Sequence, residues 1–69
     1  MNFTIELEQE DDGRWIAEVI DFSGVLAYGQ TREGAITKVK ALALRVLADR
    51  LEHGEADPEL MNVSFRAAA

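Results

Sequence analysis

The stretch TREGAITKVKALALRVLADRLEHG, residues 31–54, predicts one long helix. Successive residues of an α-helix are rotated by about 100°, which gathers the apolar side chains of this stretch on one side. They are Ile36, Val39, Ala43, Val46 and Leu47, with Ala35, Leu42, Leu44 and Leu51 beside them. This apolar arc spans about 200°, whereas an arc of about 100° is enough to cover one sheet. The surplus favours a second covered surface, most simply another subunit; scattered alanines in a small helix are the alternative explanation.

The two ends of this helix carry matching signals. Thr31 can accept a backbone N–H of the first turn through its hydroxyl, and Glu33 places a negative charge where the helix dipole favours it. Gly54 can adopt the left-handed conformation that closes a helix, and Pro58 follows it. His53, the single histidine, lies near the C-terminal end. It suits a role at the cap better than one as a metal ligand or base, because it lacks the partners that either role needs.

A hairpin is predicted before the helix. Residues 3–8 alternate between apolar and polar side chains, as expected of a half-buried strand, and residues 10–13 form a turn rich in Asp and Gly. A second strand follows at residues 14–20. We expect alternate residues of this second strand to face the helix and to face away from it. The residues facing the helix are Trp15, Ala17 and Val19, and those facing away are Ile16, Glu18 and Ile20.

Two further strands complete the predicted sheet. The third covers residues 25–28, and the fourth, an edge strand, covers residues 61–66 after a polar connector at residues 55–59. We expect residues 67–69 to fray. The order strand, strand, strand, helix, strand predicts a single two-layer α+β domain over residues 1–69.

Size and composition limit the possible classes of protein. A chain of 69 residues without cysteine can form neither a disulfide nor a thiolate metal site, and a domain this small is often stabilised by oligomerisation. No charged leader precedes an apolar stretch, and no apolar run approaches the roughly 18 residues of a membrane span. We therefore expect no signal peptide, no contact with a membrane and a cytoplasmic location.

The net charge of −6 is concentrated in the first half of the chain. Residues 1–31 hold seven acidic residues and one basic residue, whereas residues 32–53 hold three acidic and five basic residues. An acidic sheet argues against direct binding of nucleic acid, whose phosphates require Lys and Arg. It would suit a basic protein partner, because opposite charges steer encounter. The alternative is that the acidic surface only keeps the protein soluble.

A pattern of short motifs runs through residues 10–50 and resembles the HicB-type antitoxin family. An acidic turn ending in Asp-Gly is followed by an aromatic residue, an Ala-Glu-Val segment, a bend and a Gly-x-Thr-x-Glu-x-Ala opening of the helix. No single motif is specific, but a dozen positions match in register. They are Asp12, Gly13, Trp15, Ala17, Glu18, Val19, Asp21, Gly24, Gly29, Thr31, Glu33 and Ala35.

The chain also departs from the family pattern. Ile20 and Ser23 stand where the family commonly has proline, and Gly34 replaces the second Glu of the helix opening. These changes loosen the bend and the start of the helix without altering the layout. Full members of the family usually carry a C-terminal DNA-binding domain, which we do not expect in this chain. We therefore do not expect this chain to bind operator DNA as full members of the family do.

The resemblance implies a degenerate ribonuclease-H-like fold and a role that needs neither catalysis nor a cofactor. Such a protein binds and silences a small basic HicA-type toxin that cleaves mRNA. We expect the partner to contact acidic residues of the strands and an aromatic residue exposed in the bend, namely Glu6, Glu8, Glu18, Asp21 and Phe22. We expect self-association, as a dimer or a larger oligomer, through surplus apolar residues, namely Ile16, Ile20, Leu44 and Leu51.

Two other functions stay open. The chain could be an orphan HicB-like domain that serves as a subunit of another assembly. Alternatively, it could be a vestigial nuclease that binds divalent metal ions through Glu6, Glu8, Glu18 and Asp21. A solvated face of the sheet explains these carboxylates better, because the first strand has no central Asp and no histidine is near.

Overall fold

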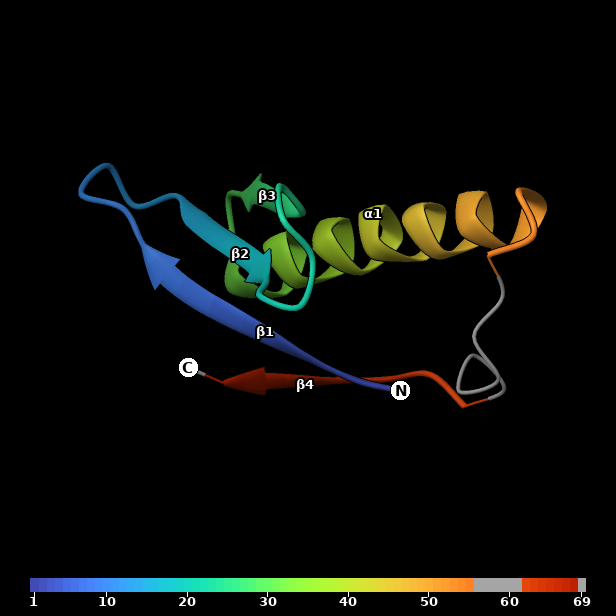
Figure 1. Ribbon diagram of the computed structural model, residues 1–69. Coiled ribbons are helices and arrows are strands. Elements are labelled where there is room, and N and C mark those ends of the chain that lie inside the picture. The colour runs from blue at the N-terminus through green and yellow to red at the C-terminus, as the bar shows by residue number, and fades with distance from the viewer. Residues whose placement is uncertain (56–61, 69) are drawn as a thin grey trace.

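The computed structural model describes residues 1–55 and 62–68 and places a four-stranded sheet against one long helix (Figure 1). The elements in chain order are β1 (Asn2–Gln9), β2 (Trp15–Val19), β3 (Leu26–Gly29), α1 (Arg32–Glu52) and β4 (Ser64–Ala68). The predicted α+β class and the order strand, strand, strand, helix, strand are confirmed. Among the described residues, no helix is long and apolar enough to cross a membrane.

The strands lie in the order β3-β2-β1-β4. The first three form an antiparallel meander, in which β1 pairs with β2 and β2 pairs with β3. After α1, the chain returns on the far side of β1, and β4 pairs with β1 in parallel (Figure 1). A parallel partner requires a long crossover, which α1 provides. β4 is therefore an edge strand, as predicted.

The ends of α1 form as the sequence predicts. The Thr31 side chain accepts a hydrogen bond from the backbone N–H of Gly34 at 2.9 Å, so it caps the N-terminus. At the other end His53 is the C-cap, and Gly54 follows with a φ of +76°. The Gly54 N–H donates to the carbonyl of Leu51 at 3.1 Å, which closes the last turn.

The core lies between the sheet and α1. The helix contributes a residue once in each turn, and the two long strands contribute alternate residues. Its buried apolar residues are Phe3, Ile5, Ala17, Val19, Phe22, Val25, Ala35, Val39, Ala43 and Leu47. Ala17 and Val19 are fully buried, and Trp15 is half-buried against the same cluster, as predicted for the face of β2 that covers the helix.

The expectation that Phe22 is exposed is wrong. Its side chain is 7% exposed, and its ring lies 5.0 Å from the ring of Phe3. The Phe22 N–H donates to the carbonyl of Val19 at 3.1 Å, so the chain turns tightly after β2. This turn brings the side chain back into the core, where the guanidinium of Arg50 lies 4.8 Å from the ring centroid. Phe22 is a core residue.

The fourth strand begins and ends later than predicted. Residues 67 and 68 do not fray: Ala67 pairs with Ile5 and Ala68 with Glu6 in the parallel ladder. Val63, which was expected inside the strand, precedes it and is exposed. Met61, the connector beyond residue 55 and the last residue lie outside the described residues.

Candidate protein-binding face

The face of the sheet that points away from α1, which we call the outer face, carries three glutamates on two adjacent strands. Glu6 of β1 lies directly opposite Glu18 of β2. The Ile20 N–H donates to the carbonyl of Thr4 at 3.2 Å, which marks that pair as hydrogen-bonded. Glu6 and Glu18 form the next hydrogen-bonded pair along the ladder, with Cα atoms about 5.5 Å apart. Glu8 follows two residues after Glu6, about 7 Å along the strand.

Apolar side chains border these glutamates on the outer face. Ile16 lies between Glu8 of β1 and Tyr28 of β3, and Leu26 lies opposite Glu18. Leu26 and Tyr28 are 39% and 42% exposed. Ala68 pairs with Glu6 on its other side. A shallow groove on this face is lined by Glu6, Leu7, Glu8, Ile16, Glu18 and Ala68.

The three glutamates have no cationic partner within the described residues, since neither of the two ion pairs found there includes them. Glu6 and Glu8 are exposed and Glu18 is half-buried. Arg66 of β4 is the nearest cation by register, because it pairs with Thr4 on the same face, but no ion pair joins it to the glutamates. The outer face therefore carries three glutamates against one cation, Arg66, and the glutamates form no ion pair within the described residues.

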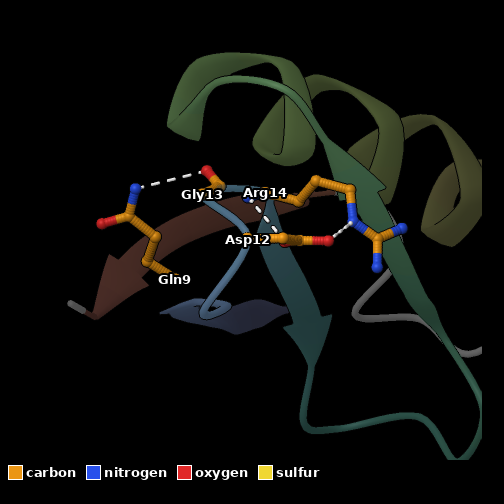
Figure 2. A network of polar contacts seen from close by, with 4 residues as sticks. All are labelled: Gln9, Asp12, Gly13 and Arg14. Carbon is orange, nitrogen blue, oxygen red and sulfur yellow. Dashed lines mark hydrogen bonds and ion pairs between the residues drawn. The ribbon is translucent and has the colours of Figure 1, made fainter.

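The other nearby cation, Arg14, is held by contacts within the hairpin turn (Figure 2). The Arg14 Nε donates to Oδ2 of Asp12 at 2.9 Å, its backbone N–H donates to Oδ1 at 3.1 Å, and its guanidinium carbon lies 4.9 Å from the ring centroid of Tyr28. Gln9 braces the same turn by donating to the carbonyl of Gly13 at 3.2 Å. These contacts hold Arg14 at the edge of the outer face, with its charge matched by Asp12.

The same contacts alter the acidity of Asp12. The hydrogen bond from the Arg14 N–H, followed by the side-chain hydrogen bond and the charge of the guanidinium, lowers the pKa of the Asp12 carboxyl below 3.8, its ordinary value. The Asp12 side chain is exposed to solvent, so its ion pair has only a local effect on the turn.

The structure separates the predicted partner-binding residues. Glu6, Glu8 and Glu18 share the outer face, but Asp21 accepts a hydrogen bond from the N–H of Thr4 at 3.0 Å. At this end of the β1–β2 ladder the chain turns away from β2, and the Asp21 carboxylate supplies the acceptor for the Thr4 N–H. Asp21 therefore has a structural role. Phe22 is in the core.

The four predicted oligomer-interface residues fall on two sides of the domain. Ile16 and Ile20 belong to the sheet side, where Ile16 is half-buried and Ile20 is 50% exposed. Leu44 and Leu51 are 49% and 50% exposed on α1, on the helix surface that faces away from the sheet. The two pairs therefore lie on two separate surfaces of the domain.

Among the residues that the structure describes, no group of three His, Cys, Asp or Glu side chains lies close enough together to hold a metal ion. His53 lies exposed at the end of α1, with Nδ1 2.7 Å from the carbonyl oxygen of Asp49 and 3.5 Å from its carboxylate. The arrangement gives no support to a metal-dependent nuclease.

Sequence reasoning missed Leu26 and Tyr28 as members of the outer face. They alternate with buried or half-buried residues of β3, but only the register of β3 against β2 shows that they extend the row of Ile16 and Glu18. Comparisons of the chain with protein-family models, with curated proteins and with solved structures found no match.

Proposed function

We propose that this chain is an antitoxin-like binding module, of the HicB type and with a degenerate ribonuclease-H-like fold, that neutralises a small basic mRNA-cleaving toxin of the HicA type. The outer face of the sheet covers the surface with which the toxin binds RNA. The observation that carries the proposal is the set of three glutamates, Glu6, Glu8 and Glu18, which are grouped on two strands and form no ion pair within the described residues.

The opposition of Glu6 and Glu18 costs the isolated domain stability. Like charges directly opposite on neighbouring strands are destabilising, by up to about 1 kcal/mol relative to neutral pairs. A basic partner would convert this repulsion into attraction on both strands at once. The arrangement is therefore better suited to a protein that works in a complex than to one that works alone.

The apolar border supports a protein partner in particular. Tyr28 and Leu26 project beside the charges, and aromatic side chains at the centre of an interface often carry much of its binding energy. Glutamates whose Cα atoms lie about 5.5 to 7 Å apart present a dense negative charge of the kind that an RNA-binding surface recognises. The expected interface combines this charge with a small apolar centre.

The test uses the product of the reading frame beside this chain's own, which the proposal predicts to be a short basic protein. That protein is expected to cleave mRNA, and addition of this chain is expected to stop the cleavage. Reversing two charges with Glu6→Lys and Glu18→Lys should weaken the complex by about a hundredfold, because close charge pairs across an interface contribute more than about 1 kcal/mol each. Raising the salt concentration should slow association of the wild-type chain.

A matched control carries the same change in net charge away from the outer face. Glu33→Lys together with Glu55→Lys should leave inhibition unchanged, since these exposed residues lie at the two ends of α1. Cleavage that continues in the presence of the wild-type chain would contradict the proposal. So would an equal loss of inhibition in the two double variants.

A further inference from the structure

We propose that α1 binds a second copy of this chain, with the two helices antiparallel, through a stripe of residues that faces away from the sheet. This inference concerns a surface opposite to the outer face and does not depend on the proposed function. The stripe, which we call the helix stripe, consists of Thr37, Ala41, Leu44, Ala48 and Leu51.

The spacing of the helix stripe is that of a helix–helix seam. Its members follow one another at intervals of four, three, four and three residues, which is the repeat by which one helix keeps contact with another. The core-facing residues, by contrast, recur every four positions from Ala35 to Leu47 on the other side of the helix. Leu44 and Leu51 are half exposed, and the alanines between them allow a second helix to approach closely.

The charges along one flank of the helix stripe favour an antiparallel pair. Lys38 and Arg45 lie in the first part of this flank, and Asp49 and Glu52 lie in the last part, all of them exposed. In a parallel two-fold pair this flank would face the opposite flank of the second copy, so Lys38 and Glu52 would not meet. In an antiparallel pair Lys38 would lie near Glu52 of the second copy, and the two-fold symmetry would form that contact twice.

The flank has charges available for such contacts. Among the described residues, Lys38, Arg45 and Glu52 form no ion pair, and Asp49 interacts only with the exposed His53. Lys38 and Glu52 could therefore pair across the dimer without breaking an ion pair within the described part of the chain.

The size of the helix stripe sets the expected affinity. Fifteen residues of helix extend about 21 Å, so the contact is small beside a standard interface of about 800 Å² per partner. We therefore expect a dissociation constant of about 10 µM or weaker. Both sheets would lie on the outside of such a dimer, which leaves each outer face open for a partner.

The test measures the mass of the full chain in solution by sedimentation equilibrium, from about 1 µM to about 1 mM, a range that spans the expected constant. The wild-type chain should pass from monomer to dimer. Leu44→Lys should raise the dissociation constant about tenfold or more, because it buries an unpaired charge in the seam. Ile20→Lys is the matched control: Ile20 is 50% exposed and Leu44 49%, but Ile20 belongs to the sheet side, so its dimerisation should be unchanged.

The direction of the helices is tested by exchanging charges. Lys38→Glu and Glu52→Lys alone should each weaken the dimer roughly fivefold, since each replaces two attractive contacts with repulsive ones. The double variant should restore wild-type affinity. Leu51→Lys provides a second disruption of the seam if Leu44→Lys fails to fold.

Three results would overturn the inference. The first is a wild-type chain that stays monomeric throughout the range. The second is a dimer weakened by Ile20→Lys and not by the substitutions in the seam. The third is a double charge variant that remains as weak as the single ones. None of these measurements includes a toxin, so their outcome is independent of the proposed function.

Discussion

At the scale of single residues, Gly29 determines how closely the helix can approach the sheet. A Cβ atom added at this position would lie 2.4 Å from the backbone nitrogen of Ala35 and 2.9 Å from the carbonyl carbon of Gly34. Backbone atoms of the first turn of α1 cannot move aside without shifting the helix. Gly29→Ala should therefore destabilise the fold by about 3 kcal/mol, the upper part of the usual range for overpacking.

Gly24 supplies the control for this prediction. Its φ is +80°, but an added Cβ would meet no atom within 4 Å, so Gly24→Ala should cost only the conformational strain of about 1 kcal/mol. Both values follow from urea denaturation of each variant. A Gly29→Ala chain as stable as the Gly24→Ala chain would contradict the close approach of helix and strand.

Asp12 provides a prediction for the pH dependence of the hairpin turn. Its folded pKa lies below the unfolded value because the Arg14 N–H and guanidinium stabilise the carboxylate. The stabilisation is therefore fully present above the unfolded pKa and is lost as the pH falls through the folded pKa. In an NMR titration, the side-chain carboxyl carbon of Asp12 should titrate below pH 3.8.

Removing the guanidinium tests the cause of this shift. Arg14→Gln should raise the pKa of Asp12 but leave it below the ordinary value, because the backbone hydrogen bond, which contributes most to the shift, remains. A midpoint for Asp12 at or above 3.8 in the wild-type chain would show that the turn does not hold the carboxylate in this way.

At the scale of elements, the helix depends on its cap. Thr31→Ala removes the hydroxyl that accepts the Gly34 N–H at 2.9 Å and should cost about 1 kcal/mol in the free energy of unfolding. Thr37→Ala is the control, because it makes the same substitution at an exposed position inside α1 that caps nothing. It should leave the free energy of unfolding unchanged or slightly higher. Thermal or urea unfolding distinguishes them, and equal stabilities would argue against the capping role.

The helix could be predicted from the sequence because its signals are local. The cap at Thr31, the closing Gly54 and the repeat of buried residues all lie within one stretch, and each formed as expected. The positions of Lys40 and Arg50, two basic residues among the apolar residues of α1, are explained only by the fold. Lys40 lies 6.0 Å from the ring centroid of Phe65 and Arg50 lies 4.8 Å from that of Phe22, so both place their charge over an aromatic ring.

The strand ends and the bend could not be predicted, because they depend on distant residues. The strand at residues 64–68 is held by pairing with β1, more than sixty positions earlier in the chain. Pairing of this kind stabilises Ala67 and Ala68, whose own composition indicates fraying. Phe22 lies in a polar bend, and its burial depends on the ring of Phe3, which local patterning does not reveal.

At the scale of the whole molecule, the domain has two surfaces with different chemistry. The outer face of the sheet carries Glu6, Glu8 and Glu18, and the helix stripe lies on the opposite side of the two layers. The alternation of the strands was enough to predict that these glutamates share a face. The opposition of Glu6 and Glu18, and the border formed by Leu26 and Tyr28, required the registers of three strands, which the sequence does not specify.

The most direct test of the central claim, that the outer face binds a basic protein, is an NMR titration of the ¹⁵N-labelled chain with the product of the neighbouring reading frame, which the account predicts to be short and basic. The account predicts shifts of the amide signals of Glu6, Glu8, Ile16 and Glu18, while the signals of Leu44 and Leu51 stay unchanged. Shifts confined to α1, or no shift at saturating concentrations of that protein, would contradict it.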